Sequence, residues 1–533
     1  MTVCRPERFD VAIVGSGVAG SMLAGILAGA GARVALIDRQ THPRFAVGES
    51  STPLADALLR TLGRKHRWQR LTNWATWGGW QRDSPGATVG KKRGFTYIRD
   101  RVADGPAMRG SGSNEEPNET AAPSGLTGRL REQRCLIAAS TEDEVSDTHW
   151  HRATSDSILH RDALGRGAVD FSGCTINELS VEPEIRIRVR AGNHDRMLVA
   201  GTLIDASGSG WVHRATNAAD WTPRMQTNTS CRYAHFRYVG SSPDSLRHHD
   251  DPFDLDDAAV HHWFGSQGWA WVLRFGPELA SVGWVHPGGP APGSMVPPGR
   301  LSDVLCSARR DADESPTTDK PFIADFDPAV VTDHWRSMRR IQRWGPAVLR
   351  PRVWLLPTAA ATIDPLHSTG LAHALAGVDR LANRFLSAEG DDSTYGQLVH
   401  DEVAWVDRLV SLAYQQIHDF DRFVDACQLF LVAAIRSEHA MDGGRHDASD
   451  VLPDGGLFGV RDAEFRRAME SAIERLSDPT VSTQQRRLRI CDTLQPFNVA
   501  GLFSSIDGVY RRSATKSPAI RDANLATSTE NVT

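Results

Sequence analysis

Hydrophobic residues open the chain in a short run and then recur at the spacing of a helix. Val11 to Val14 form an apolar run that predicts a buried strand, and the small residues from Val18 to Ala30 predict a closely packed helix. Arg33 to Ile37 predict a second strand. Strand, helix and strand in this order make a βαβ unit, so we expect an α/β fold that begins with a Rossmann-type domain.

Two later stretches alternate apolar and polar residues, as strands with one buried face do. The first runs from Val181 to Val199, and the second runs from Gln267 to Trp284 around a turn near Gly276 and Pro277. We expect these strands to form the sheet that faces the bound cofactor. We place this inserted, substrate-side sheet at about residues 211–350.

The pattern changes beyond about Ser387. Apolar residues recur at i, i+3, i+4 and i+7 from Tyr395 to Ile435, and again over 462–476. We therefore predict a domain over 1–385 followed by a helical C-terminal region over 386–533. Residues 102–128 contain hardly any large apolar side chain, and we predict that they form a mobile insertion because they cannot offset the entropy of ordering.

Three glycines between the first strand and the first helix have the G-x-G-x-x-G spacing. Gly15 allows a tight turn, Gly17 allows the backbone to approach a pyrophosphate, and Gly20 allows the helix to pack closely on the strand. The helix begins at Val18 and Ala19, where its N–H groups and positive dipole face an anion. The pattern predicts a dinucleotide site.

An acidic residue closes the second strand. Asp38 stands 18 residues after Gly20, where a carboxylate can accept hydrogen bonds from both ribose hydroxyls and disfavours a 2′-phosphate. We expect Arg39, the next residue, to lie against the same cofactor.

Composition excludes several classes of function. The chain has 533 residues, 40% of them hydrophobic and 23% charged, which is typical of a globular protein. A net charge of -5 gives no basic surface for nucleic acid, and no apolar run approaches the ~20 residues that span a membrane. The N-terminus passes directly into the first strand without room for a signal peptide, so we expect a cytoplasmic protein.

Cysteine and histidine positions do not indicate a metal site. The 7 cysteines are scattered and never form C-x-x-C, so neither a disulfide framework nor a zinc site is expected. His261 and His262 are adjacent, and neighbours on a strand point to opposite faces. We predict no metal.

Three separated segments resemble flavin-dependent halogenases, within the wider group of FAD-dependent monooxygenases. They are RFAVGESSTPLADALL (44–59), LVAGTLIDASGSG (198–210) and DPLHSTGLAHALAGVDRLA (364–382). The resemblance implies FAD as the cofactor. It also implies cofactor contacts at Glu49, Ser50, Asp205, Asp364, Gly370 and Leu371.

The segment GKKRGFTYI resembles the family's lysine strand and assigns the catalytic lysine to Lys92 in preference to Lys91. In the family, flavin hydroperoxide oxidises halide to hypohalous acid, and the lysine binds it or forms a haloamine. The resemblance also places the halide at the backbone amides of Thr369 and Gly370. The alternative from the residues alone is a solvated basic pair on an edge strand.

Two tryptophans and one histidine are candidates for contact with the substrate. Trp269 and Trp271 resemble the start of the family's W-x-W-x-I-P signature, with Arg274 in place of its proline. They would line the substrate wall or form an aromatic ladder in the core. His367 stands where tryptophan-specific members carry a glutamate, and a neutral histidine supplies no fixed negative charge. We keep His367 as a candidate catalytic residue and expect phenols to need that charge less.

The leading hypothesis is an FAD-dependent halogenase-like oxidoreductase that uses halide, O2 and an electron-rich aromatic substrate. One alternative is an FAD monooxygenase or another flavin oxidoreductase without halide, and another is a catalytically silent FAD-binding partner protein. A second dinucleotide fingerprint is not found in the sequence. We therefore expect a separate flavin reductase to supply reduced FAD.

Overall fold

The computed structural model describes most of the chain, and the fold is given for those residues. They are 5–100, 133–140, 142–237, 241–242, 244–288, 336–387, 392–442, 456–505 and 508–510. The predicted insertion at 102–128 lies outside them.

The first sheet is built around the predicted βαβ unit, which the structure confirms. The helix α1 (Val18–Gly29) connects two parallel neighbours, and further strands extend the sheet on both sides. In spatial order its main path is β17 (Val348–Arg350), β18 (Val353–Leu355), β10 (His194–Asp205), β1 (Glu7–Val14), β2 (Val34–Asp38) and β7 (Val169–Ser172). The order is that of a Rossmann-type domain, because the chain reverses direction across the sheet beside β1.

One predicted strand assignment is wrong. The alternating residues at 181–199 do not join the sheet that faces the cofactor. They form β9 (Ile185–Ala191) and the start of β10, and with β8 (Thr175–Ser180) they make an antiparallel extension of the first sheet. The period-2 pattern identified the strands but not their partner strands. Alternation of apolar and polar residues shows that one face of a strand is buried, but it does not show which sheet the strand joins.

The second sheet contains the predicted hairpin. Its strands β13 (Trp269–Arg274) and β14 (Leu279–Pro287) pair antiparallel across a turn in which Gly276 has a φ of +131°. The full order is β15 (Arg336–Met338), β11 (Thr229–Arg237), β14, β13, β12 (Ala259–Trp263), β4 (Gly94–Arg99), β5 (Arg134–Ala138) and β20 (Val509–Tyr510). Three of these strands therefore come from outside the range 211–350.

Two short ladders and several helices complete the core. The ladders pair β3 (Val89–Lys92) with β6 (Asp147–Trp150) and β16 (Arg343–Trp344) with β19 (Ala361–Thr362). Beside α1 lie α6 (Arg152–Gly165) and α10 (Thr369–Ser387). The shorter helices are α2 (Pro53–Lys65), α3 (Gln69–Asn73), α4 (Trp77–Asp83), α7 (Trp211–Ala215) and α9 (Pro357–Ala360).

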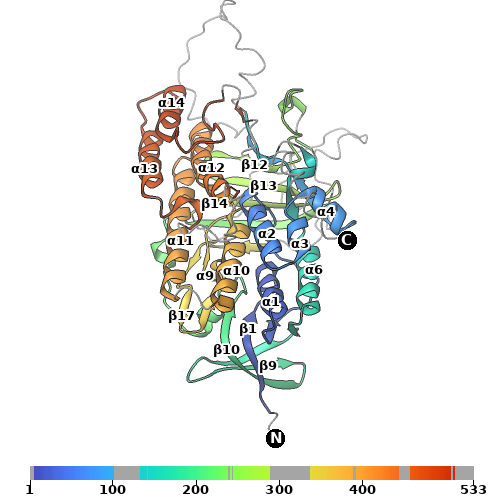
Figure 1. Cartoon of the computed structure of the whole chain (residues 1–533). Coiled ribbons are helices and arrows are strands. Elements are labelled where there is room, and N and C mark those ends of the chain that lie inside the picture. Colours follow the sequence, from blue (N-terminus) through green and yellow to red (C-terminus); the bar gives the residue numbers. More distant parts are fainter. Residues whose placement is uncertain are drawn as a thin grey trace, which may run out of the picture.

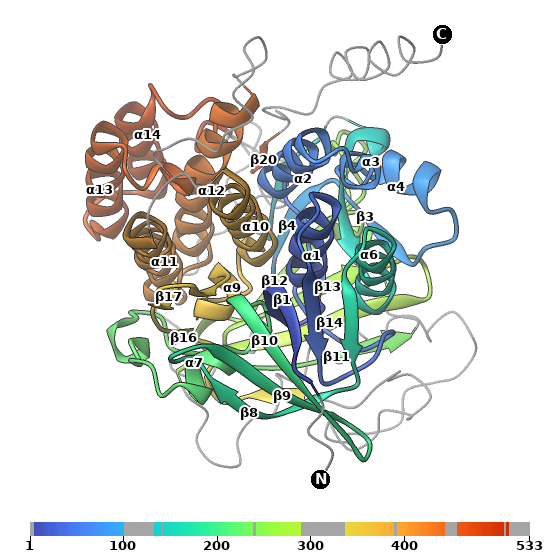
Figure 2. The same cartoon turned by 60° about the horizontal axis from the view of Figure 1, so that its bottom comes forward.

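The C-terminal region is helical, as predicted. The helices α11 (Asp392–Gln415), α12 (Phe420–Asp442), α13 (Ala463–Ser477) and α14 (Thr483–Leu494) gather on one side of the molecule (Figures 1 and 2). The helix α12 packs against α2 from the first half of the chain. The C-terminal helices therefore help to enclose the space between the two sheets.

Among the described helices, none combines the length and hydropathy that a bilayer span requires. The cytoplasmic location and the domain boundaries stay predictions.

Candidate functional site

The turn between β1 and α1 has room for a ligand beside one glycine only. A Cβ on Gly15, whose φ is +108°, would lie 2.5 Å from the Ala206 carbonyl oxygen, and a Cβ on Gly20 would lie 1.8 Å from the Gly15 oxygen. A Cβ on Gly17 would meet only side-chain ends at 3.4–3.6 Å, those of Arg152, Arg44 and Asp156. The fold itself therefore requires Gly15 and Gly20, whereas Gly17 keeps space for something that approaches from outside.

The N-terminus of α1 offers donors to that space. Within the described residues, the helix has neither a side-chain cap nor an acidic residue in its first turn, and Val18 and Ala19 are buried at its start. Two guanidinium groups, those of Arg44 and Arg152, lie near Gly17. Uncapped N–H groups next to arginine fit a pyrophosphate. Sequence reasoning missed both arginines: Arg44 stands inside a segment that was recognised, but nothing near the fingerprint signals Arg152.

Asp38 lies across the same turn. One carboxylate oxygen accepts from the Ser16 N–H at 2.9 Å, the Ser16 hydroxyl at 3.0 Å and Arg44 at 3.2 Å, and the other accepts from the Gln40 N–H at 3.0 Å. Burial raises the pKa of Asp38, but these hydrogen bonds and the Arg44 charge outweigh it and the pKa lies below its usual value. Asp38 is therefore an anion at neutral pH. The neighbouring Arg39 is exposed.

The segment that follows Arg44 runs beside β6. Ser50 forms a bridge with His149, and the Ser51 N–H donates to the Thr148 carbonyl at 2.9 Å. Glu49 is buried and its carboxylate lies 2.6 Å from Nε2 of His235 on β11. The segment thus connects the first sheet to the second, and direct cofactor contacts by Glu49 and Ser50 stay predictions.

Two buried aspartates hold backbone turns. Asp205 accepts hydrogen bonds from the N–H groups of Ser207 and Val212 at 2.9 and 2.7 Å. Asp364 accepts from the Thr229 hydroxyl at 2.7 Å and the Tyr414 hydroxyl at 2.9 Å. Burial raises the pKa of Asp364 to about 6 against these hydrogen bonds. The described partners of both carboxylates are protein groups, so contact with FAD stays a prediction for each.

Lys91 and Lys92 point to opposite sides of β3. The Lys91 ammonium forms ion pairs with Asp143 at 2.7 Å and Asp257 at 2.9 Å near the surface. Lys92 is fully buried, donates to the Ser51 carbonyl at 2.6 Å, and lies 4.2 Å from the centre of the Phe95 ring. A fully buried ammonium that donates to a backbone carbonyl and lies on an aromatic face differs from a solvated surface lysine.

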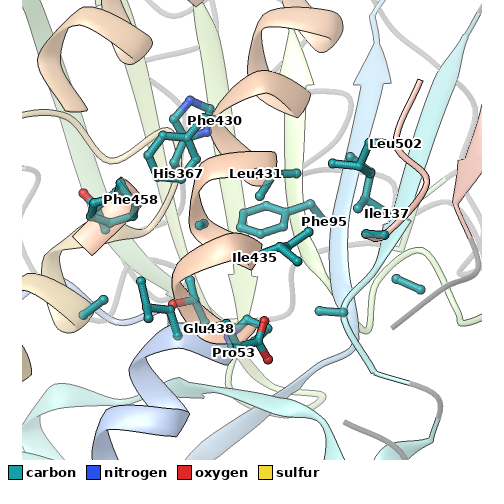
Figure 3. A pocket seen from close by; sticks show the side chains of 18 residues that line it. Pro53, Phe95, Ile137, His367, Phe430, Leu431, Ile435, Glu438, Phe458 and Leu502 are labelled. Atoms are coloured by element: carbon teal, nitrogen blue, oxygen red, sulfur yellow. The ribbon is translucent and has the colours of Figure 1, made fainter. Parts of the chain in front are cut away.

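A cavity lies beside Phe95, where α2, α10 and α12 meet the second sheet. Figure 3 shows the stacked His367 and Phe430 rings and the side chains of Phe95, Leu431 and Ile435 around the same space. Its lining also includes Thr52, Pro53, Ile137, Thr369, Glu438, Phe458 and Leu502. The structure therefore brings the predicted residues His367 and Thr369 together, and it places Lys92 behind Phe95. The sequence did not predict that residues of α12 line the cavity, because a helical period predicts which residues pack in the core and not which of them face a cavity.

The two tryptophans are anchored in the core. Trp269 is fully buried and donates to the Tyr414 hydroxyl at 2.9 Å. Trp271 donates to the Ser281 hydroxyl at 3.1 Å and packs on Gly283, where a Cβ would lie 2.2 Å from its ring. Neither ring lines the cavity that the described residues form. This arrangement favours the aromatic ladder, and the substrate-wall role stays a prediction.

The start of α10 has an unusual backbone. Ser368 adopts a left-handed φ of +54°, which is uncommon for a residue other than glycine. Gly370 is exposed, and a Cβ there would meet nothing within 4 Å. The predicted contact of Gly370 with the flavin ring system therefore stays a prediction. Leu371, the next residue, is buried.

Buried histidines lie near Lys92 and at the cavity. His149 and His367 are almost fully buried, and burial lowers the pKa of each to about 3, with the Lys92 charge adding to the effect at His149. The pKa of His261 is lowered well below its usual value by burial and by neighbouring groups that include Lys92. All three imidazoles are therefore neutral at pH 7.

Comparisons with known proteins find an FAD-binding family model and relatives among the halogenases. A family model described as "FAD binding domain" matches residues 8–51. Monodechloroaminopyrrolnitrin halogenase PrnC of Pseudomonas fluorescens is 25% identical over 427 residues, which cover 79% of this chain and 68% of that protein. Tetracycline 7-halogenase of Kitasatospora aureofaciens is 26% identical over 430 residues, which cover 76% of this chain and 70% of that protein.

Solved structures share the fold. Halogenase PltM in complex with phloroglucinol and FAD is similar with a TM-score of 0.75 and 20% identity, covering 94% of this chain and 99% of that one. The α/β architecture with a helical C-terminal region is therefore the fold that these structures share, and the family match over residues 8–51 supports FAD as the cofactor.

Proposed function

Because this chain is related to the flavin-dependent halogenases, we propose that it is an FAD-dependent oxidoreductase that halogenates an electron-rich aromatic substrate. The observation that carries the proposal is the placement of Lys92, which is fully buried behind Phe95, whose ring lines a cavity together with His367 and Thr369. Reduced FAD, when bound, supplies the electrons with which O2 becomes an oxidant of halide.

The cofactor would be held by the residues that keep space or charge for it. Gly17 and the α1 N-terminus would receive the pyrophosphate, with Arg44 and Arg152 beside it, and Asp38 would accept from the ribose. Gly370 would lie against the ring system. In the same proposal the backbone amides of Thr369 and Gly370 bind the halide.

Lys92 would act on the hypohalous acid that results. Its ammonium donates a hydrogen bond to the oxygen of that acid, so that oxygen leaves as water while the halogen forms a bond to a ring carbon. The ring then loses the proton from the same carbon. The balance is one aromatic C–H and one hypohalous acid consumed, and one carbon–halogen bond and one water formed. The apolar lining of the cavity keeps bulk water from competing for the electrophile.

The test is a single turnover with the FAD-loaded protein, reduced chemically and mixed with O2, bromide and a panel of phenols and indoles. We expect a brominated product that forms only when bromide is present. A hydroxylated product that forms without halide would support an FAD monooxygenase on the same scaffold. No flavin reoxidation by O2 would support a catalytically silent FAD-binding partner.

A separate flavin reductase would supply the electrons. We expect NADPH alone to leave the bound FAD oxidised, because the anionic Asp38 repels a 2′-phosphate and no second fingerprint is found in the sequence. The measurement is the flavin absorbance after addition of NADPH under nitrogen, with and without a flavin reductase. Rapid, stoichiometric bleaching by NADPH without the reductase would contradict this prediction.

A further inference from the structure

His367 has two ring nitrogens without a described partner. The side chain is 1% exposed and lines the cavity, and neither Nδ1 nor Nε2 is hydrogen-bonded to any described residue. The orientation of the ring is fixed by packing, because it stacks on Phe430 at a centroid distance of 4.1 Å and an interplanar angle of 7° (Figure 3). Buried polar groups in native proteins are nearly always paired, so an imidazole fixed in this way points to a missing ligand.

Other polar side chains also line the cavity. The Thr52 hydroxyl accepts from the Ala55 N–H at 3.3 Å and so caps α2. Thr369 and the buried Glu438 line it as well, and Glu438 takes part in a further interaction. Most of the remaining lining is aliphatic or aromatic. A ligand in this cavity therefore meets apolar surface on most sides and a few polar groups, among them the neutral imidazole of His367.

On the basis of the proposed function, we propose that the substrate is a phenol and that His367 binds its hydroxyl group. A hydroxyl both donates and accepts, so it pairs with an imidazole nitrogen whether or not that nitrogen carries the proton. An indole or pyrrole N–H only donates, so it matches one of the two states. The apolar lining contributed by Phe95, Phe430, Leu431 and Ile435 suits the ring that carries the hydroxyl.

The pairing also serves the chemistry. Because burial keeps His367 neutral, it does not ionise a phenol in the resting complex and only accepts its hydrogen bond. When the halogen bonds to the ring, positive charge spreads to the hydroxyl oxygen and its proton becomes strongly acidic. That proton then passes to the imidazole, leaving a neutral halogenated dienone, which loses the proton from the halogenated carbon and regains a hydroxyl proton as it becomes aromatic again.

The test compares resorcinol with 1,3-dimethoxybenzene, which has a similar ring but no hydroxyl. The variants are His367→Phe, which keeps the stacking ring without nitrogens, and His367→Gln, which restores a donor and an acceptor. The control is His373→Phe, because His373 is also buried but does not line the cavity. We measure bromination kcat/KM and, by calorimetry, equilibrium binding of each aromatic to the FAD-loaded protein.

We expect His367→Phe to lower kcat/KM for resorcinol about tenfold to a hundredfold and to weaken its binding, with no such change for 1,3-dimethoxybenzene. His367→Gln should recover part of the loss, and His373→Phe should match the wild type. Equal binding of resorcinol by wild type and His367→Phe, or tighter binding of indole than of resorcinol by the wild type, would overturn the proposal. Failure of the proposed function gives a different result. In that case resorcinol binds in a way that depends on His367, but no brominated product forms.

Discussion

Replacing Lys92 with methionine should abolish the halogenated product while flavin chemistry continues. Methionine fills the buried volume of the side chain and removes the ammonium that lies between the Ser51 carbonyl and Phe95. Loss of one donor aimed at developing charge in a closed site costs about 10²–10³ in rate. We expect product formation to fall by at least that factor, with unchanged FAD binding and unchanged reoxidation of reduced FAD by O2.

The neighbouring lysine provides a matched control. Lys91→Met removes an ammonium one residue away that pairs with Asp143 and Asp257 on the outer side of β3. Partly exposed ion pairs contribute little, so bromination by this variant should stay close to that of the wild type. Both variants are compared in the same single turnover by product mass and flavin absorbance. If Lys92→Met brominates as well as Lys91→Met does, the assignment of the lysine is wrong.

Gly17→Val should prevent FAD binding without unfolding the protein. A Cβ at Gly17 meets only the flexible ends of three side chains, so the apoprotein can accommodate it. The added side chain occupies the space of the phosphate instead, and loss of two charge-assisted hydrogen bonds at about 1.5–3 kcal/mol each weakens binding by about a hundredfold or more. FAD affinity is measured by quenching of flavin fluorescence, and the fold by circular dichroism.

Two other glycines separate ligand exclusion from damage to the fold. Gly20→Ala places a Cβ 1.8 Å from the Gly15 carbonyl oxygen, so urea unfolding of the apoprotein should show a loss of about 1–3 kcal/mol or more. Gly165→Val adds a side chain at the end of α6, where nothing lies within 4 Å, and should leave FAD affinity unchanged. Normal FAD binding by Gly17→Val would place the pyrophosphate elsewhere.

The sequence predicts the parts of the fold whose signals are local. The G-x-G-x-x-G turn, its helix and Asp38 are contiguous, so spacing alone places them, and the structure confirms β1, α1 and β2. The helical period likewise predicts α11 and α12. On β3, the alternation of side chains predicts that Lys91 and Lys92 face opposite ways, and the burial of Lys92 agrees.

The missed features depend on contacts between distant segments. Arg152 reaches the space near Gly17 only because α6 packs on α1, and Phe430 on α12 stacks on His367, which lies just before α10. The sheet that β9 joins was also missed, because alternation does not say which sheet a strand joins. Asp364 illustrates the same limit: its partners Thr229 and Tyr414 lie far from it in the sequence, while its predicted cofactor contact stays a prediction.

The measurement that tests the central claim most directly is a turnover under ¹⁸O2. The FAD-loaded protein is reduced, mixed with ¹⁸O2, bromide and resorcinol, and the product is weighed by mass spectrometry. If the chain delivers halogen, the product carries bromine with its two-isotope signature and no ¹⁸O, because the oxygen leaves as water. A product that carries ¹⁸O and no bromine would contradict the account and assign the protein to the monooxygenases.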